Sequence, residues 1–76
     1  MPPLPVVSGA KAVDVFVSLG WRIDRRESSH VTLVKAGLAV ALSIPQHREL
    51  GRGLLRGLIR TAGITVDEFV ISLRAL

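Results

Sequence analysis

The chain of 76 residues contains no cysteine, which excludes disulfide bonds and metal sites built from thiolates. Aromatic side chains are also scarce, since Phe16, Trp21 and Phe69 are the only ones. Valine, leucine, isoleucine and alanine must therefore build the core. The hydrophobic fraction of 49% is sufficient for a packed domain and too high for a disordered segment.

No apolar run approaches the length of about 20 residues that a membrane-spanning helix needs. The opening segment, residues 1–5, lacks the positive charge and the apolar block of a signal peptide. We therefore expect a cytoplasmic protein. The two histidines and six acidic residues show no metal-ligand spacing, so we expect no metal and no other cofactor. The length predicts a single domain over residues 1–76.

Acidic residues are outnumbered, and the net charge is +4. Eight of the ten basic residues are arginine, whose planar guanidinium binds phosphate with a fork of donors. The composition therefore favours contact with nucleic acid over an inert basic surface.

The N-terminal part of the chain has the pattern of an amphipathic helix. Its apolar residues recur at helical spacing: Ala10, Val13, Phe16 and Val17. Ser8 is a favourable N-cap, and Gly20 can adopt the left-handed conformation that ends helices. We predict a helix over residues 9–19.

Three runs of alternating residues follow, and each predicts a β-strand. Trp21 and Ile23 alternate with Arg22 and Asp24; Val31 and Leu33 oppose His30, Thr32 and Val34; Val40, Leu42 and Ile44 oppose Ala39, Ala41 and Ser43. The links are short, one at residues 27–29 and one a bend near Gly37, which predicts an antiparallel meander. Pro45 cannot donate to a strand ladder and is expected to end the third strand.

Two more helices are predicted after the strands. The apolar stripe of the first consists of Leu54, Leu55, Leu58, Ile59 and Ala62, with Arg52, Arg56 and Arg60 on its other side. Gly63 ends this helix. Thr65 and Glu68 form a capping box for the last helix, whose apolar face consists of Val66, Phe69, Val70 and Leu73. The result is an α+β fold: helix, three-stranded antiparallel sheet, helix and short C-terminal helix, with the helices on one face of the sheet.

His30 is the first candidate for chemistry because histidine exchanges protons near neutral pH. It opens the second strand, close to Arg25, Arg26 and Ser29, and the alternation places it on the face opposite Val31. Two interpretations follow from the residues alone. His30 is either a solvated strand-end residue or a general acid or base acting beside arginines that hold a phosphate.

Further residues have both a structural and a functional interpretation. His47 is either a solvated loop residue or a phosphate contact near a helix N-terminus. The arginines of the second helix, Arg52 and Arg56 among them, form a solvated face, a track for phosphates or a contact for an acidic partner. Gly53 and Gly57 each cost that helix about 0.5–1 kcal/mol relative to alanine, which suggests close approach of another backbone or of a ligand.

Several short motifs together resemble a known family. They are Ser8-Gly9, Gly20-Trp21, Arg25, Ser29-His30, Pro45, His47 and the runs at residues 50–56 and 62–69. In this order and at this spacing, the chain is similar to the HicA-type toxins of toxin–antitoxin systems over nearly its whole length. The resemblance implies a fold like that of double-stranded-RNA-binding domains, and it implies a small ribonuclease that cuts mRNA. It also implies a cognate HicB-type antitoxin that holds the enzyme inactive.

In such toxins the catalytic histidine follows a Gly-Ser pair, and the resemblance therefore implies this role for His30. The chain departs from the family at Ser28, where glycine is usual, and at Val31, where a second histidine or another polar or aromatic residue is common.

Our leading hypothesis is a metal-independent mRNA endonuclease. The expected RNA and phosphate contacts are Arg25, Arg26, Ser29, His47, Arg52 and Arg56. The alternatives are a non-catalytic RNA-binding module of the same fold and a structural partner subunit with a degenerate site.

Overall fold

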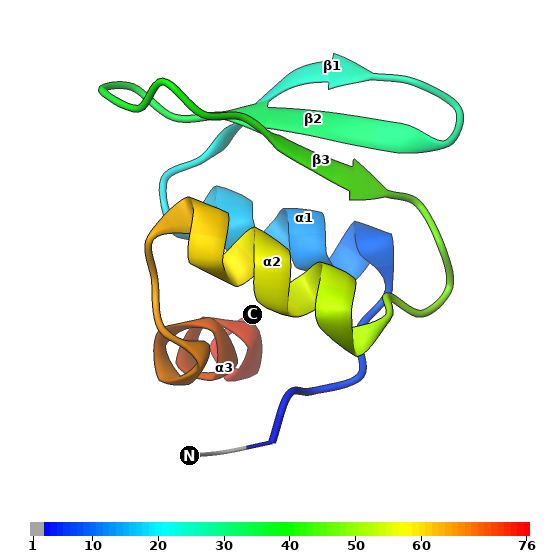
Figure 1. Ribbon diagram of the computed structural model, residues 1–76, viewed down its shortest axis with the longest axis vertical. Helices are drawn as coiled ribbons and strands as arrows, with labels where there is room; N and C mark the ends of the chain where they lie inside the picture. The colour runs from blue at the N-terminus through cyan, green and yellow to red at the C-terminus, as the bar shows by residue number, and fades with distance from the viewer. Residues whose placement is uncertain (1–2) are drawn as a thin grey trace.

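The computed structural model describes residues 3–76, so the first two residues of the predicted domain and of the opening segment lie outside it. Its elements are α1 (Gly9–Ser18), β1 (Arg22–Arg26), β2 (His30–Val34), β3 (Leu42–Pro45), α2 (Arg52–Ala62) and α3 (Val66–Arg74) (Figure 1). This order confirms the predicted α+β fold, with a helix, a three-stranded antiparallel sheet and two further helices.

The sheet is a meander with the strand order β1-β2-β3, in which both neighbouring pairs are antiparallel. Thr32, at the centre of β2, lies opposite Arg25 on one side and Ser43 on the other. The pairing of β1 with β2 is irregular between Ile23 and Arg25, because Asp24 is an extra residue with no partner across the ladder. This β-bulge changes which residues of β1 share a face.

All three helices lie on one side of the sheet (Figure 1). Helix α1 packs against β1 and β3, α2 packs against β3, and α3 packs against both other helices. Arg25, His30 and Ser43, on the opposite sheet face, are exposed. The molecule therefore has one solvent-facing sheet surface on which side chains can meet a ligand.

The core lies between the sheet and the helices, and none of the buried residues among residues 3–76 is charged. Its buried residues are Val7, Ala12, Val13, Val15, Phe16, Trp21, Val31, Leu33, Leu42, Ile44, Leu50, Leu55, Leu58, Ile59, Ala62 and Phe69. Phe16 is at the centre, with its ring centroid 5.4 Å from that of Phe69 and 6.5 Å from that of Trp21. All three aromatic residues therefore serve packing, and none is exposed to stack on a base.

The predicted capping residues are confirmed, although α1 ends at Ser18, one residue before the predicted end. The Ser8 side chain accepts a hydrogen bond from the Lys11 backbone N–H at 3.0 Å, which caps α1. The capping box of α3 is complete, because the Thr65 N–H donates to Glu68 Oε1 and the Glu68 N–H donates to Thr65 Oγ1. Gly20 and Gly63 follow α1 and α2 with φ values of 100° and 75°, as helix-ending glycines do.

The third strand begins later than predicted. Residues 39–41 were expected in it, but β3 starts at Leu42, and Val40 is 45% exposed in the loop before it. The residue that would face Val40 in this register is Lys35. Its side chain instead reaches the carbonyl of Leu19, with an Nζ to oxygen distance of 3.0 Å. Since β2 has ended at Val34, Val40 has no strand to pair with.

The predicted buried residues of α1 and α2 are also partly wrong. Ala10 and Val17 of α1 are exposed, whereas Val15, which was not predicted, is fully buried. The reason is that α1 contacts the sheet on one side and α3 on another, so its buried surface is not a single stripe. On α2, Leu54 is 38% exposed, although it was expected in the buried stripe.

Candidate functional site

The hairpin between β1 and β2 places His30 at a strand end. Its turn consists of only Ser28 and Ser29, and the Glu27 N–H donates to the His30 carbonyl at 2.8 Å. No residue other than glycine has a positive φ in the described part of the chain. Ser28 therefore fits the turn without backbone strain.

The His30 ring is exposed on the solvent-facing side of the sheet, while its neighbour Val31 points into the core and is 2% exposed. Ser29 Oγ lies 2.9 Å from His30 Nδ1. The direction of this hydrogen bond depends on the tautomer of the ring. In both tautomers Nδ1 is engaged, so Nε2 is the ring nitrogen left to exchange a proton with a substrate.

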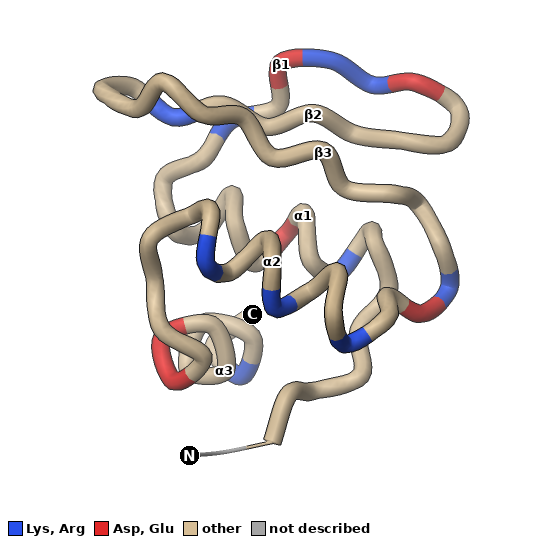
Figure 2. Tube along the Cα trace, viewed as in Figure 1, with Lys and Arg blue, Asp and Glu red and all other residues tan. Residues whose placement is uncertain are grey.

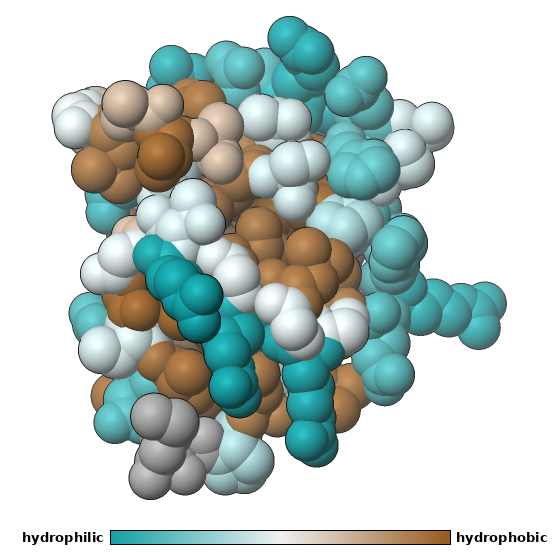
Figure 3. Space-filling model, in the orientation of Figure 1, coloured by the Kyte–Doolittle hydropathy of each residue, from teal (hydrophilic) through white to brown (hydrophobic). Residues whose placement is uncertain are grey.

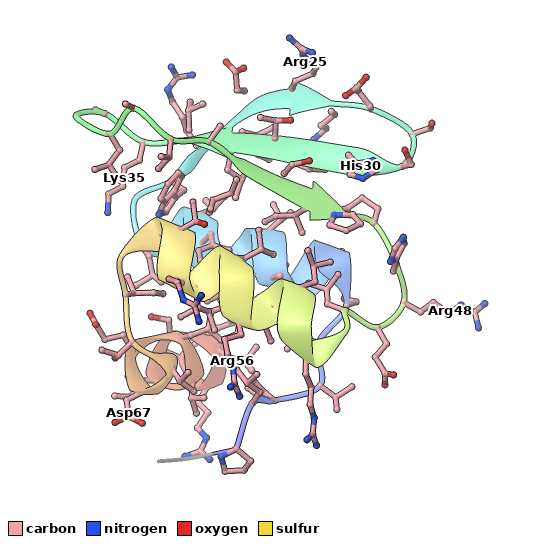
Figure 4. All side chains as sticks on the ribbon, viewed as in Figure 1. Arg25, His30, Lys35, Arg48, Arg56 and Asp67 are labelled. Atoms are coloured by element: carbon pink, nitrogen blue, oxygen red, sulfur yellow. The ribbon has the colours of Figure 1, made fainter. Side chains whose placement is uncertain are left out.

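The bulge determines which arginine shares the face of His30. Arg25 lies opposite Thr32, and cross-strand partners share a face, so Arg25 is on the same side as His30. Arg26 lies opposite Val31 and has the inward register, although it is exposed at the sheet edge. Of the two β1 arginines expected to contact phosphate, Arg25 is thus the one placed diagonally from His30 (Figure 4).

Glu27 was not recognised from the sequence as a site residue. It lies directly across the hairpin from His30, because a two-residue turn makes the residues that flank it face each other. The turn length could have revealed this position. A carboxylate at this point gives the surface around His30 charges of both signs.

His47 lies in the loop after β3, at the same end of the sheet as His30. His30 pairs with Pro45, and the Gln46 N–H donates to the Ser29 carbonyl at 2.8 Å. The His47 carbonyl accepts a hydrogen bond from the Gly9 N–H at 2.9 Å, which connects this loop to the first turn of α1.

Arg48 follows His47 and extends outward from this end of the molecule (Figure 4). It is exposed and was not among the predicted residues, although its position next to His47 was a signal.

Arg52 and Arg56 belong to a different surface. Both are exposed on α2, on the helical side of the sheet, and the Arg56 side chain extends away from the sheet (Figure 4). The structure therefore separates the predicted residues into two groups. Arg25, Arg26, Ser29 and His30 are together with His47 at the same sheet end, whereas Arg52 and Arg56 lie on the helix layer.

Within residues 3–76, no three histidine, aspartate or glutamate side chains are close enough together to hold a metal ion. The described helices are also too short or too polar for any of them to span a membrane.

The fold and this hairpin define a class: a small basic α+β domain with a serine-bound histidine exposed beside an arginine. A comparison with protein families identifies the group within this class. The family model described as the HicA toxin of bacterial toxin–antitoxin systems matches residues 9–64, which is well over half of the chain. The chain therefore belongs to the HicA toxin family, and the resemblance seen in the sequence is confirmed. Among curated proteins no relative matches it.

As a member of this family, the protein is a toxin of a toxin–antitoxin system, and its partner is an antitoxin.

Proposed function

We propose that this toxin is a metal-independent endoribonuclease that cleaves mRNA in the cytoplasm and is neutralised by a HicB-type antitoxin. The observation that carries the proposal is the contact of 2.9 Å between Ser29 Oγ and His30 Nδ1 on an exposed strand end. A hydrogen bond of this kind fixes the ring orientation and leaves the second nitrogen for proton transfer. Membership of the HicA family supports the same conclusion.

RNA brings its own nucleophile, which suits a site with few catalytic groups. The ribose 2′-oxygen attacks the adjacent phosphorus and loses its proton, while the bond from phosphorus to the 5′-oxygen breaks and that oxygen gains a proton. The products are a 2′,3′-cyclic phosphate and a 5′-hydroxyl end. His30 Nε2 either accepts the first proton or donates the second, and a positioned group of this type contributes about 10²–10⁴-fold to the rate.

The arginines supply the charge that this reaction needs. Arg25 shares the face of His30 and would stabilise the negative charge that develops on the phosphorane. Arg26 and His47 would bind neighbouring phosphates at the same end of the sheet, and Ser29 would orient the histidine. RNA that reached Arg52 and Arg56 as well would have to pass around a sheet edge onto the helix layer.

A non-catalytic RNA-binding module is the second proposal. It is supported by exposed arginines on both the sheet and α2, since domains of the double-stranded-RNA-binding type bind by shape and by phosphate contacts. In that case His30 would be one polar contact among many, and its removal would leave RNA affinity nearly unchanged.

The test is cleavage of a defined mRNA by the antitoxin-free protein with a strong chelator present, beside His30→Ala. His30 is exposed and outside the core, so the variant is expected to keep the stability of the parent. The expected loss in the single-turnover rate is about 10²–10⁴-fold, with cyclic phosphate ends on the products of the parent.

Arg22→Ala is the matched control, because Arg22 lies on the same face of the sheet at the far end of β1. Equal cleavage by the parent and by His30→Ala would refute the role of His30. Binding without cleavage by either protein would favour the RNA-binding module.

A further inference from the structure

Helix α2 has a solvent-exposed surface on which residues of two kinds are regularly arranged. This surface is separate from the sheet face that carries His30. Successive residues of a helix are rotated by about 100°, so residues four apart form inclined rows. One row on the exposed side consists of arginines, and the next row consists of small residues. The rows are Arg52, Arg56 and Arg60, followed by Gly53, Gly57 and Thr61. Leu54 borders the second row, and we refer to these seven residues as the α2 arginine face.

The fold itself does not require the composition of this face. A Cβ atom added to Gly53 or Gly57 would meet no atom within 4 Å, so neither glycine is needed for packing inside the chain. Both residues weaken the helix that contains them. Leu54 points outward with 38% of its surface exposed.

The charge of this face is of one sign. The helix RGLLRGLIRTA contains no acidic residue, and three of its residues are arginines. In the view of Figure 2 these positions run along the front of α2, and in Figure 3 hydrophilic side chains cross α2 beside apolar surface.

The shape of the face fits a second helix. The row that contains Gly53 and Gly57 has no side chains at these two positions, between the arginine row and Leu54, and helices pack by inserting the ridge of one into the groove of the other. Without Cβ atoms at Gly53 and Gly57, the two backbones could approach to about 8 Å, the short end of the usual range. A partner helix in this position would place one edge over the arginines and the other over Leu54.

The spacing of the charges fits the same occupant. Residues four apart in a helix are separated by about 6 Å along its axis, so acidic residues at this interval in a partner would match Arg52, Arg56 and Arg60 in register. We propose that the α2 arginine face binds an acidic amphipathic helix of a protein partner. The inference rests on the proposed function in one respect, because the antitoxin is the partner expected to supply this helix.

RNA fits the face less well than a protein helix does. Proteins that bind single-stranded RNA without sequence preference stack its bases on exposed aromatic side chains, and Phe16, Trp21 and Phe69 are all buried. Two glycines and an exposed leucine offer nothing to a phosphate. The face also lies on the helix layer, away from the sheet surface that carries His30 (Figure 4).

The experiment uses Gly57→Leu, which places a side chain in the row of small residues, and Arg56→Glu, which reverses one charge. The probes are the antitoxin encoded beside this toxin and a single-stranded RNA oligonucleotide, each titrated calorimetrically against the full chain. Ala10→Leu and Arg74→Glu are the matched controls, because they make similar changes at exposed positions of α1 and α3. Thermal unfolding of Gly57→Leu is expected to shift upward, so a loss of binding could not be attributed to unfolding.

We expect both α2 variants to bind the antitoxin at least about tenfold more weakly than the parent, as central interface residues do, while both controls bind normally. RNA affinity and cleavage of Gly57→Leu should stay within about twofold of the parent, since Gly57 is not among the expected RNA contacts and the face lies away from the proposed RNA site. Unchanged antitoxin affinity in both variants would overturn the inference. Loss of RNA binding with normal antitoxin affinity would also overturn it and assign the face to RNA.

A parent protein that shows no cleavage, together with α2 variants that lose the antitoxin, would contradict the proposed nuclease and leave this inference supported.

Discussion

Gly9→Ala tests the contact that joins the first helix to the end of the sheet. Gly9 is buried at the start of α1, and a Cβ atom there would overlap the Pro45 carbonyl oxygen and approach Gln46 Cα to 2.9 Å. Its N–H also donates to the His47 carbonyl at 2.9 Å. The added methyl group therefore cannot be accommodated unless α1 moves away from the loop that follows β3.

The expected loss of stability follows from two terms. Forcing an extra methyl group into a packed contact costs about 1–3 kcal/mol, and weakening the hydrogen bond to His47 costs about 0.5–1.5 kcal/mol. Together they lower the free energy of unfolding by about 2–4 kcal/mol, from a total of about 4–11 kcal/mol for a chain of this length. The melting temperature should fall by about 8–30 °C.

Gly53→Ala is the matched control because it makes the same chemical change in a helix where the new Cβ meets nothing within 4 Å. It should raise the free energy of unfolding by about 0.5–1 kcal/mol. Urea denaturation followed by circular dichroism measures both variants. The reasoning would be refuted if Gly9→Ala were as stable as the parent, or if the two substitutions changed stability in the same direction.

Three further predictions concern single side chains. Thr65→Ala removes the cap of α3 and should lower the melting temperature by about 4–8 °C, since such caps contribute about 1 kcal/mol, whereas Thr61→Ala on the exposed side of α2 should not lower it. Phe69→Ala empties a site with 0% exposure at the centre of the core and should cost about 3–5 kcal/mol by urea denaturation; a loss below about 1 kcal/mol would contradict the described core. Ser29→Ala removes the hydrogen bond to His30 Nδ1 and should slow single-turnover cleavage by about 2- to 13-fold without changing the melting temperature. This loss is far smaller than the one expected for His30→Ala. An equal loss of rate in both variants would show that Ser29 does more than orient the ring.

Features that depend on a few neighbouring residues could be predicted from the sequence. The N-caps at Ser8 and Thr65 require only a hydroxyl at the right distance from the first turn. The helix-ending glycines and the alternation around His30 are local in the same way. The alternation of His30 with the buried Val31 correctly predicted that His30 is exposed. A role in proton transfer requires this exposure.

Features that depend on pairing between distant segments could not be predicted. The start of β3 depends on where β2 ends, and the residue after β2, Lys35, contacts the carbonyl of Leu19, which is 16 residues away in the sequence. Regular alternation from Ile23 would have placed Arg25 on the inner face, and only the pairing with β2 reveals the bulge that moves it outward. The separation of Arg52 and Arg56 from His30 likewise depends on how α2 packs against the sheet.

The bulge at Asp24 divides β1 into two segments in which the inward and outward positions alternate with opposite phase. The first segment contributes Ile23 to the core side, and the second contributes Arg25 to the solvent side. Ile23 and Arg25 are two residues apart yet face opposite sides, so the strand changes phase between them. In a relative whose first strand is regular, the outward basic residue would follow the inward apolar residue directly, one position earlier than here. In such relatives the arginine equivalent to Arg25 would be one residue closer to the tryptophan equivalent to Trp21. It must therefore be identified by its pairing partner on β2, and not by its distance from that tryptophan along the chain.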